Sequence, residues 1–391
     1  MIHDTGLFTI GEGLVQNFSS FTAMRVFIGI MEAGLIPGSC LLLAAYYPRY
    51  EMQWRLNMLM VGNAVSSAFG GLIALGVSTI HAPNGYNGWR WLFIIEGTIT
   101  AGISAMVYFF MSDWPETATW LTAEEKQILA DRIRLEGIIG RMDKLDRRAF
   151  IRCITDWKIW IWCVCLRNHK HFRLTPPSSL ILACSVLSLY SINLFAPTII
   201  KQLNPTSSAG HIQALTIPIF VASGAFSLLA AYLSDKLHHR SGFAILGFIT
   251  TLAGLVIMLH QAHVACAIRY FALYLISIGA YTSVPALWLL LINNCSGRWK
   301  VAIAIGMETG LGNVGGIASS LIFLSDMAPE YTVGWKVSTG MVVSALVLTC
   351  AYVVGLWWEN SRREDGFRNW RLEGKGKGNL GDDHPRFRYT Y

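Results

Sequence analysis

Two ionisable side chains, Arg25 and Glu32, lie seven residues apart in an apolar stretch near the start of this 391-residue chain. Seven residues are two turns of an α-helix, so both side chains share one face. A desolvated carboxylate can take up and release a proton, and a guanidinium can hold an organic carboxylate through two parallel hydrogen bonds. The pair therefore predicts proton and anion binding. The alternative is that Arg25 reaches the outer lipid headgroups while Glu32 bonds a neighbouring helix.

Three further ionisable side chains lie within apolar stretches, and their depth distinguishes them. Glu96 and Arg269 are within two helical turns of the ends of their stretches, which favours anchoring at the membrane surface or packing between helices. Glu308 lies deeper, in a glycine-rich stretch. Because ionisable groups at that depth are costly in lipid, they are expected to face a cavity or a partner. Glu308 is therefore a further candidate for substrate binding or coupling.

Other polar and small residues in the apolar stretches have structural explanations. Asn63 and Asn313 are predicted to form hydrogen bonds between helices. Glycines four residues apart allow two helices to approach closely, which indicates packing rather than ligand binding. These pairs are Gly34/Gly38, Gly306/Gly310 and Gly312/Gly316.

The composition indicates what must position these residues. Hydrophobic residues make up 53% of the chain and charged residues only 14%, and the mean hydropathy is +0.44. Soluble domains carry about 25% charged residues, so the chain is a polytopic membrane protein rather than a soluble enzyme or a disordered chain. Its eight cysteines form neither a disulfide framework nor a zinc-binding spacing. No phosphate-binding glycine loop is present, so no cofactor is expected.

Nine stretches are long and apolar enough to cross a bilayer as helices, which requires about 20 residues each. The expected fold is therefore an all-α bundle of transmembrane helices. The stretches are 21–47, 57–80, 91–111, 178–200, 212–233, 243–260, 264–292, 301–324 and 336–358.

The basic residues predict the orientation of these spans. Most of the 31 Lys and Arg residues fall in alternate turns, in the long loop after the third span and in the C-terminal tail. The positive-inside rule places that loop and the tail in the cytoplasm and the N-terminus outside. The net charge of +7 is thus a topology signal and not a sign of nucleic-acid binding. Trp357-Trp358 followed by Arg362-Arg363 is typical of an anchor at the membrane surface, with both arginines reaching the headgroups.

An internal repeat divides the chain into two parts. Three matching segments occur in the same order before and after the long loop, for example Gly88-Trp-Arg90 and Gly334-Trp-Lys336. The first three spans therefore correspond to the last three of the six that follow, as in carriers built from two parallel repeats. The expected domains are an incomplete N-terminal bundle (1–112), a central loop (113–177), a six-helix bundle (178–358) and a tail (359–391). A complete carrier would have six plus six spans, so three are expected to be missing here.

Several segments resemble the major facilitator superfamily, and within it the fungal allantoate- and nicotinate-type permeases of the anion:cation symporter branch. They are 24–39, 88–98, 113–126, 292–320 and 325–335. The resemblance implies that Arg25 and Glu32 serve in anion recognition and proton coupling. It also implies that the turn from Asp235 to Arg240 is the second-half version of the superfamily's cytoplasmic loop motif. By itself this turn is either a solvated loop or a conformational latch between helices.

The sequence departs from the family pattern at 166–177, where basic, histidine and proline residues interrupt an apolar run. This insert is consistent with a retained intron. The predicted function is secondary transport of a small organic anion, such as a vitamin-like or ureide carboxylate, with a proton, by a monomer in the plasma membrane. One alternative is a non-transporting truncated remnant of such a permease, or the product of a wrongly assembled gene for one. The other is a membrane-embedded enzyme, for which only the His238-His239 turn offers suitable residues.

Overall fold

The computed structural model describes residues 2–78, 88–135, 151, 178–203, 206–323, 330–372 and 381–391. Within these ranges the regular structure is helical and contains no strand, which confirms the all-α prediction. The predicted number of spans is also confirmed, because the described residues contain nine helices long and apolar enough to cross a membrane. The insert at 166–177 lies outside the described residues.

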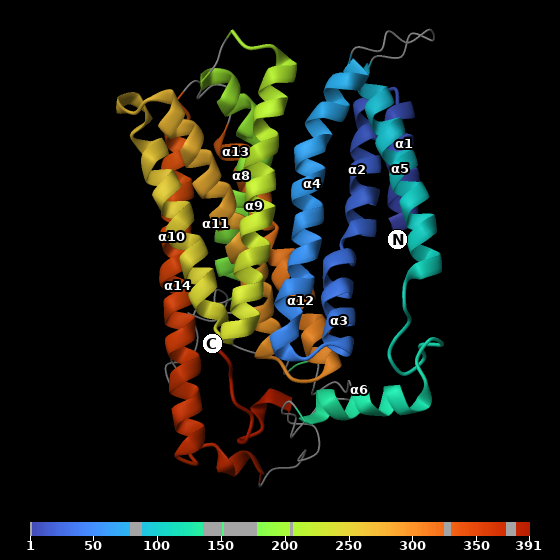
Figure 1. Cartoon of the computed structure of the whole chain (residues 1–391), viewed down its shortest axis with the longest axis vertical. Coiled ribbons are helices and arrows are strands. Elements are labelled where there is room, and N and C mark those ends of the chain that lie inside the picture. Colours follow the sequence, from blue (N-terminus) through green and yellow to red (C-terminus); the bar gives the residue numbers. More distant parts are fainter. Residues whose placement is uncertain are drawn as a thin grey trace.

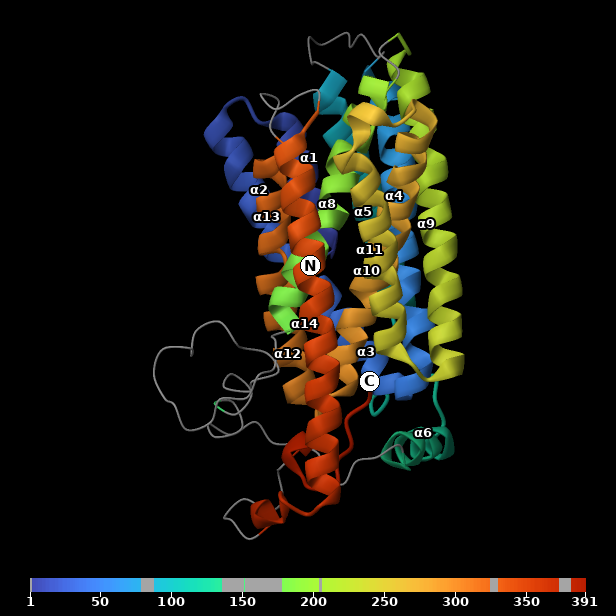
Figure 2. The same cartoon turned by 90° about the vertical axis from the view of Figure 1, so that its left-hand side faces the viewer.

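The helices form two groups that stand side by side (Figure 1). We call α1–α5 the N-terminal half; α4 packs against the second group, and α6 lies crosswise below the bundle (Figures 1 and 2). These helices are α1 (Ile2–Leu14), α2 (Phe18–Glu32), α3 (Leu35–Tyr46), α4 (Met52–Ser78), α5 (Gly88–Phe110) and α6 (Ala123–Leu135).

The second group, which we call the C-terminal half, contains six of the candidate spans. In this half α9 faces α4 of the other half (Figure 1). The helices are α8 (Ser178–Leu203), α9 (Ala209–Leu237), α10 (Arg240–Leu259), α11 (Cys266–Asn293), α12 (Arg298–Gly312), α13 (Val314–Ile322) and α14 (Thr332–Glu364).

One end of the bundle carries α6, the 3₁₀ turn η1 (Arg49–Glu51) and the C-terminus (Figures 1 and 2). We call it the basal end. At this end the long helices extend beyond the predicted apolar runs. The span that contains α4 begins at Arg49 rather than at residue 57, and α14 ends at Glu364 rather than at 358. The difference arises because helices continue into the polar region, where hydropathy no longer marks them.

Local capping explains several helix starts. Asn17 accepts a hydrogen bond from the Ser20 backbone N–H at 2.8 Å, which caps α2. Before α6, the Thr122 N–H donates to the Glu125 carboxylate while the Glu125 N–H donates to the Thr122 hydroxyl, so the two residues form a capping box. These hydrogen bonds lower the pKa of Glu125, because they stabilise its ionised form.

Two predicted spans are each divided into two helices. The first is broken between Glu32 and Leu35, where Pro37 follows in the first turn of α3 and needs no hydrogen bond from its nitrogen. The eighth is broken at Asn313, which ends α12 and precedes α13. Both breaks fall at mid-length, so they divide a continuous apolar run that hydropathy alone presents as one helix.

Helix α1 was not predicted as an element, because its 13 residues are too short for a span. It packs closely on α5 through glycines on both helices. A Cβ atom on Gly6 would lie 2.7 Å from the Ala101 nitrogen, and one on Gly97 would lie 2.6 Å from the Ile10 nitrogen. The close contact fixes the position of α1 beside α2 and α5.

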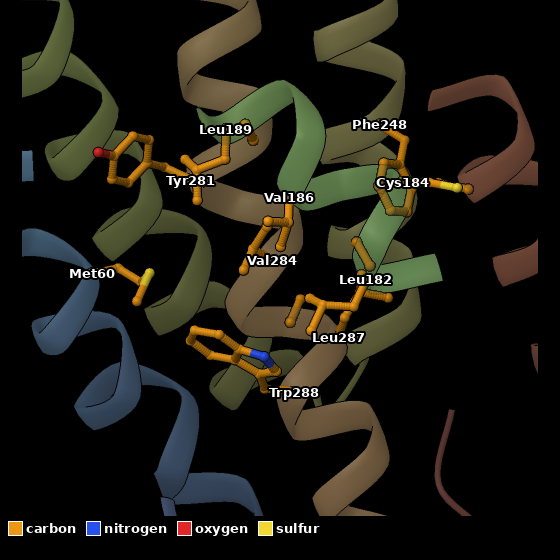
Figure 3. Packing of buried hydrophobic residues seen from close by; sticks show 14 of the residues in the cluster. Met60, Leu182, Cys184, Val186, Leu189, Phe248, Tyr281, Val284, Leu287 and Trp288 are labelled. Carbon is orange, nitrogen blue, oxygen red and sulfur yellow. The ribbon is translucent and has the colours of Figure 1, made fainter. Parts of the chain in front are cut away.

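The C-terminal half contains the main core, with α11 at its centre. Most α11 residues from Ala272 onward are buried, and Tyr281, Leu287 and Trp288 belong to a hydrophobic cluster that also includes residues of α8 and α10 (Figure 3). Met60 extends the cluster to α4 of the other half (Figure 3). By contrast, most residues of the three spans in the N-terminal half are exposed or only partly buried.

The end of α14 differs from the expected membrane anchor. The Arg362 guanidinium lies 3.8 Å from the centre of the Trp358 ring, as an anchor at the surface would. The Arg363 side chain does not reach outward, because only 1% of it is exposed and it binds the C-terminal segment of the chain. The expectation that both arginines reach the headgroups was therefore wrong for Arg363.

Helices α10 and α11 approach closely at Gly279. A Cβ atom on Gly279 would lie 2.6 Å from the Thr251 nitrogen, whereas one on Gly340 of α14 would meet open space. We expect Gly279→Val to lower the free energy of unfolding by about 2 kcal/mol or more, measured from melting in detergent. Gly340→Val is the matched control and should melt like the wild type. Equal melting of the two variants would contradict the packing described here.

Candidate functional site

Arg25 is engaged by a carboxylate that the sequence analysis did not identify. Its Nε atom lies 2.6 Å from Oε1 of Glu12 on α1. The Glu12 side chain is 1% exposed, whereas that of Arg25 is 52% exposed. The guanidinium carbon also lies 5.3 Å and 5.2 Å from the ring centres of Phe21 and Phe93. These rings and Glu12 hold one side of the guanidinium, while its other side stays accessible.

Two more carboxylates lie within electrostatic range of the same guanidinium. Glu32 follows Arg25 on α2 and is exposed, and Glu96 on α5 is partly buried. Arg25 therefore interacts with carboxylates from three helices, α1, α2 and α5. We call Arg25, Glu12, Glu32 and Glu96 the arginine cluster. Glu96 was expected to be an anchor or packing residue, and its proximity to Arg25 is compatible with a packing role between helices.

The sequence holds only a weak signal for Glu12. Gly6 and Gly13 are seven residues apart and therefore share one helix face. A Cβ atom on Gly13 would lie 2.6 Å from Cγ1 of Ile94, so this face packs on α5. The glycine spacing could have indicated a packed helix before residue 15, but placing Glu12 beside Arg25 requires tertiary information.

Glu308 lies at the contact between the two halves. It is 0% exposed, and within the described residues neither carboxylate oxygen has a hydrogen-bond partner. It lies on α12 within electrostatic range of the buried Cys40 on α3. An ionised carboxylate is costly in such a place unless it is paired. Glu308 is therefore suited to bind a proton, and it is not brought together with the arginine cluster by any described contact.

Polar hydrogen bonds join α4 to the C-terminal half. The Asn57 side-chain amide donates to the backbone oxygen and the hydroxyl of Ser227, at 2.8 Å and 2.7 Å. Further along α4, Asn63 accepts a hydrogen bond of 3.1 Å from the Tyr281 hydroxyl on α11. Asn63 thus bonds between helices, while Asn313 marks the break between α12 and α13.

The turn from Asp235 to Arg240 bridges the halves at the basal end. Asp235 accepts a hydrogen bond of 2.9 Å from the Trp54 N–H at the start of α4. Arg240, with 1% of its side chain exposed, donates to Asp235 at 3.1 Å and to the Gln53 side chain at 2.9 Å. It also donates to the Arg49 backbone oxygen. The turn therefore joins η1 and the start of α4 to the C-terminal half, and a latch that opens during transport stays a prediction.

The three predicted glycine pairs differ in their surroundings, and both glycines of the Gly306/Gly310 pair have open space where close packing was expected. A Cβ atom on Gly312 would lie 2.5 Å from Leu182, and one on Gly316 would lie 3.2 Å from the Tyr190 ring, so this pair packs on α8. Gly38 has open space where close packing was expected, and Gly34 lies at the break before α3. Gly34 and Gly38 therefore belong to the irregular segment of the first span.

A cavity of about 500 Å³ lies at the basal end between the two halves. Its lining includes Tyr47 and Arg49 of the N-terminal half, Lys126 of α6, and Asn293 and Cys295 of the C-terminal half. Across the described part of the chain, no three His, Cys, Asp or Glu side chains are grouped as a metal site would require. The cavity is a recess with both apolar and polar walls, which come from both halves.

Three comparisons with known proteins all match this chain to transporters. A family model described as Major Facilitator Superfamily matches residues 5–320. An uncharacterized transporter of Schizosaccharomyces pombe is 30% identical over 363 residues, which are 92% of this chain and 68% of that protein. The high-affinity nicotinic acid transporter of Saccharomyces cerevisiae is 25% identical over 390 residues, 99% of this chain and 69% of that protein. The fold is similar to that of the proton:xylose symporter XylE, with a TM-score of 0.56, 18% identity, and coverage of 90% of this chain and 79% of that chain.

The Asp235–Arg240 turn can be tested through a buried cysteine. Asp235→Asn removes the charge that pairs with the buried Arg240, so the basal ends of the two halves should separate more often. Cys295, which is 5% exposed and lines the basal cavity, should then react faster with a maleimide, as measured by mass spectrometry of its peptide. Lys236→Gln in the same turn is the control, because Lys236 is exposed. Equal labelling of the two variants would show that the turn does not hold the halves together.

Proposed function

The chain belongs to the Major Facilitator Superfamily, and from this premise we propose that it transports a small organic anion together with a proton. The proposed mechanism is rocking of the two halves around a central site. The basal end faces the cytoplasm, in agreement with the basic residues of the loops and tail. The protein acts as a monomer in the plasma membrane and belongs to the allantoate- and nicotinate-type branch.

The observation that carries this proposal is the arginine cluster. One guanidinium is paired with Glu12 at 2.6 Å and lies within electrostatic range of Glu32 and Glu96. With all three carboxylates ionised, one positive and three negative groups share the site, and an incoming anion is repelled. A proton on one carboxylate removes one negative charge and leaves the guanidinium freer to bind the carboxylate of a substrate.

The carboxylates and the anion interact with the same guanidinium, and this shared interaction couples binding of the proton to binding of the anion. If a proton makes anion binding tighter, an anion makes proton binding tighter by the same factor. Glu32 is the proposed proton carrier, because it is exposed and shares α2 with Arg25. Arg25 is the proposed anion-binding residue, since its side chain is half exposed although Glu12 is buried.

Glu308 has a second proposed role in coupling. Its buried, unpartnered carboxylate lies where α12 meets α3 of the other half. When the halves rock, this contact must change, so the environment of the carboxylate differs between the two states. A group whose surroundings alternate in this way can bind a proton in one state and release it in the other.

The chemistry of the arginine cluster supports a carboxylate as the proposed substrate. A guanidinium binds a planar carboxylate in a bidentate manner, and the rings of Phe21 and Phe93 already lie against it. One relative is a nicotinic acid transporter, and nicotinic acid is a small aromatic carboxylic acid. We therefore propose a vitamin-like or ureide carboxylate, with nicotinate and allantoate as the first probes.

The proposal is tested by uptake in proteoliposomes that contain the full chain. With an acidic exterior, radiolabelled nicotinate or allantoate should accumulate. Glu32→Gln should abolish accumulation driven by the pH gradient, because the carboxyl can no longer exchange a proton, while exchange of labelled for unlabelled anion continues. Glu124→Gln on α6 is the matched control and should behave like the wild type.

Two outcomes would contradict the proposal. If Glu32→Gln keeps the wild-type dependence on the pH gradient, Glu32 does not carry the proton. If the folded wild-type protein transports neither anion, by uptake or by exchange, anion transport by this chain is wrong. In both experiments, the melting temperature in detergent establishes that the protein is folded.

A further inference from the structure

The C-terminal segment, residues 381–391, is bound by side chains at the basal end of the C-terminal half. The Lys300 ammonium lies 2.6 Å from the Asp382 carboxylate, and the two side chains are 2% and 1% exposed. Arg363 of α14 donates to the backbone oxygens of Asp382 and Phe387 at 2.9 Å and 3.0 Å. Buried charges that are paired in this way lose their compensation when one partner leaves, so these contacts hold the segment against the ends of α12 and α14.

Two asparagine side chains bind the backbone of this segment on both its donors and its acceptors. Asn360 of α14 accepts from the Tyr389 N–H and donates to the Tyr389 oxygen, each at 2.9 Å. Asn294, which follows α11, binds the N–H and the oxygen of Thr390 in the same way, again at 2.9 Å. The asparagines thus replace the backbone partners that an extended peptide finds in a sheet. The two asparagines therefore bind the backbone of the segment and make these hydrogen bonds whatever its side chains are.

Aromatic side chains of the segment extend this contact towards the other half. Phe387 and Tyr389 are 3% and 5% exposed, and the Tyr389 hydroxyl accepts a hydrogen bond of 2.7 Å from Arg363. The Arg49 guanidinium lies 4.9 Å from the centre of the Phe387 ring, which is a cation–π distance. Arg49 belongs to η1 of the N-terminal half, and its backbone oxygen also receives the Arg240 hydrogen bond. Phe387 therefore lies at the junction of the two halves.

We infer that residues 381–391 form an intramolecular clamp that holds the basal ends of the two halves together and thereby slows transport. The buried ion pair and the asparagine contacts fix the segment to the C-terminal half, whereas it touches the N-terminal half through Arg49 and Phe387. If the halves separate at the basal end, the Arg49–Phe387 contact breaks while the other contacts remain. The clamp thus favours the state with a closed basal end, and release of the segment shifts the population towards the open state.

The connection from α14 to the segment is itself fixed at its start. Glu359 accepts hydrogen bonds from Arg368 at 2.9 Å and 2.5 Å, and it lies 3.4 Å from Arg363. Arg363 thereby links the helix end to the clamp. A factor that displaced the segment, such as a protein that binds an extended peptide, would act as an activator.

The test measures closure of the basal end without substrate. The rings of Tyr50 and His238, one from each half, lie 4.3 Å apart, so Tyr50→Cys and His238→Cys can be joined by a short bifunctional cross-linker. Phe387→Ala removes the contact between the halves and leaves the Lys300–Asp382 pair in place. It should lower the cross-linking rate roughly two- to fivefold, the range for one cation–π contact. Asp382→Asn, which removes the charge that pairs with the buried Lys300 and so weakens the hold on the segment, should lower it further, and both variants should transport faster.

The matched control is Arg386→Gln, because Arg386 is an exposed residue of the same segment. It should cross-link at the wild-type rate. Unchanged cross-linking in folded Phe387→Ala and Asp382→Asn proteins would overturn the clamp, and so would slower transport with unchanged cross-linking. Although the clamp rests on the proposed rocking motion, cross-linking needs neither anion nor proton. Failure of the clamp, seen by cross-linking, can therefore be distinguished from failure of the proposed function, which Glu32→Gln tests by uptake.

Discussion

A guanidinium surrounded by more carboxylates than it can neutralise is the constraint on which the proposed chemistry depends. Charge within a membrane protein must be paired or neutralised, and Arg25 pairs directly with only one of its three neighbouring carboxylates, Glu12. That pair exists because α1 packs on α5 through Gly6 and Gly97. The remaining negative charge favours proton binding at the site, and the partly exposed guanidinium favours anion binding.

Under the proposed rocking mechanism, the contacts between the halves are the ones that must form and break. Polar hydrogen bonds join α4 to α9 and α11, and the buried Arg240 ties the start of α4 to α10. Hydrogen bonds and ion pairs of this kind have discrete partners, so the interface is either formed or broken rather than continuously deformed. The buried carboxylate of Glu308 also lies between the halves, where α12 meets α3, and in the proposed mechanism its proton binding responds to their separation.

The sequence predicts the parts of this structure that depend on local chain properties. Apolar runs indicated the nine spans, and helical spacing placed Arg25 and Glu32 on one helix. The break at Asn313 was not located, because it lies within a continuous apolar run. Glu12 and the buried role of Arg363 could not be predicted, because each depends on a partner far along the chain that no local pattern identifies.

The most direct test of coupling through the arginine cluster is the number of protons taken up when the anion binds. Isothermal titration of the purified full chain with the transported anion, in two buffers of different ionisation enthalpy, gives this number without a membrane. Coupling predicts net proton uptake on anion binding. This uptake should rise with pH over the range in which the carboxylates of the arginine cluster become ionised in the free protein. Anion binding with no proton uptake at any pH would contradict coupling through this cluster.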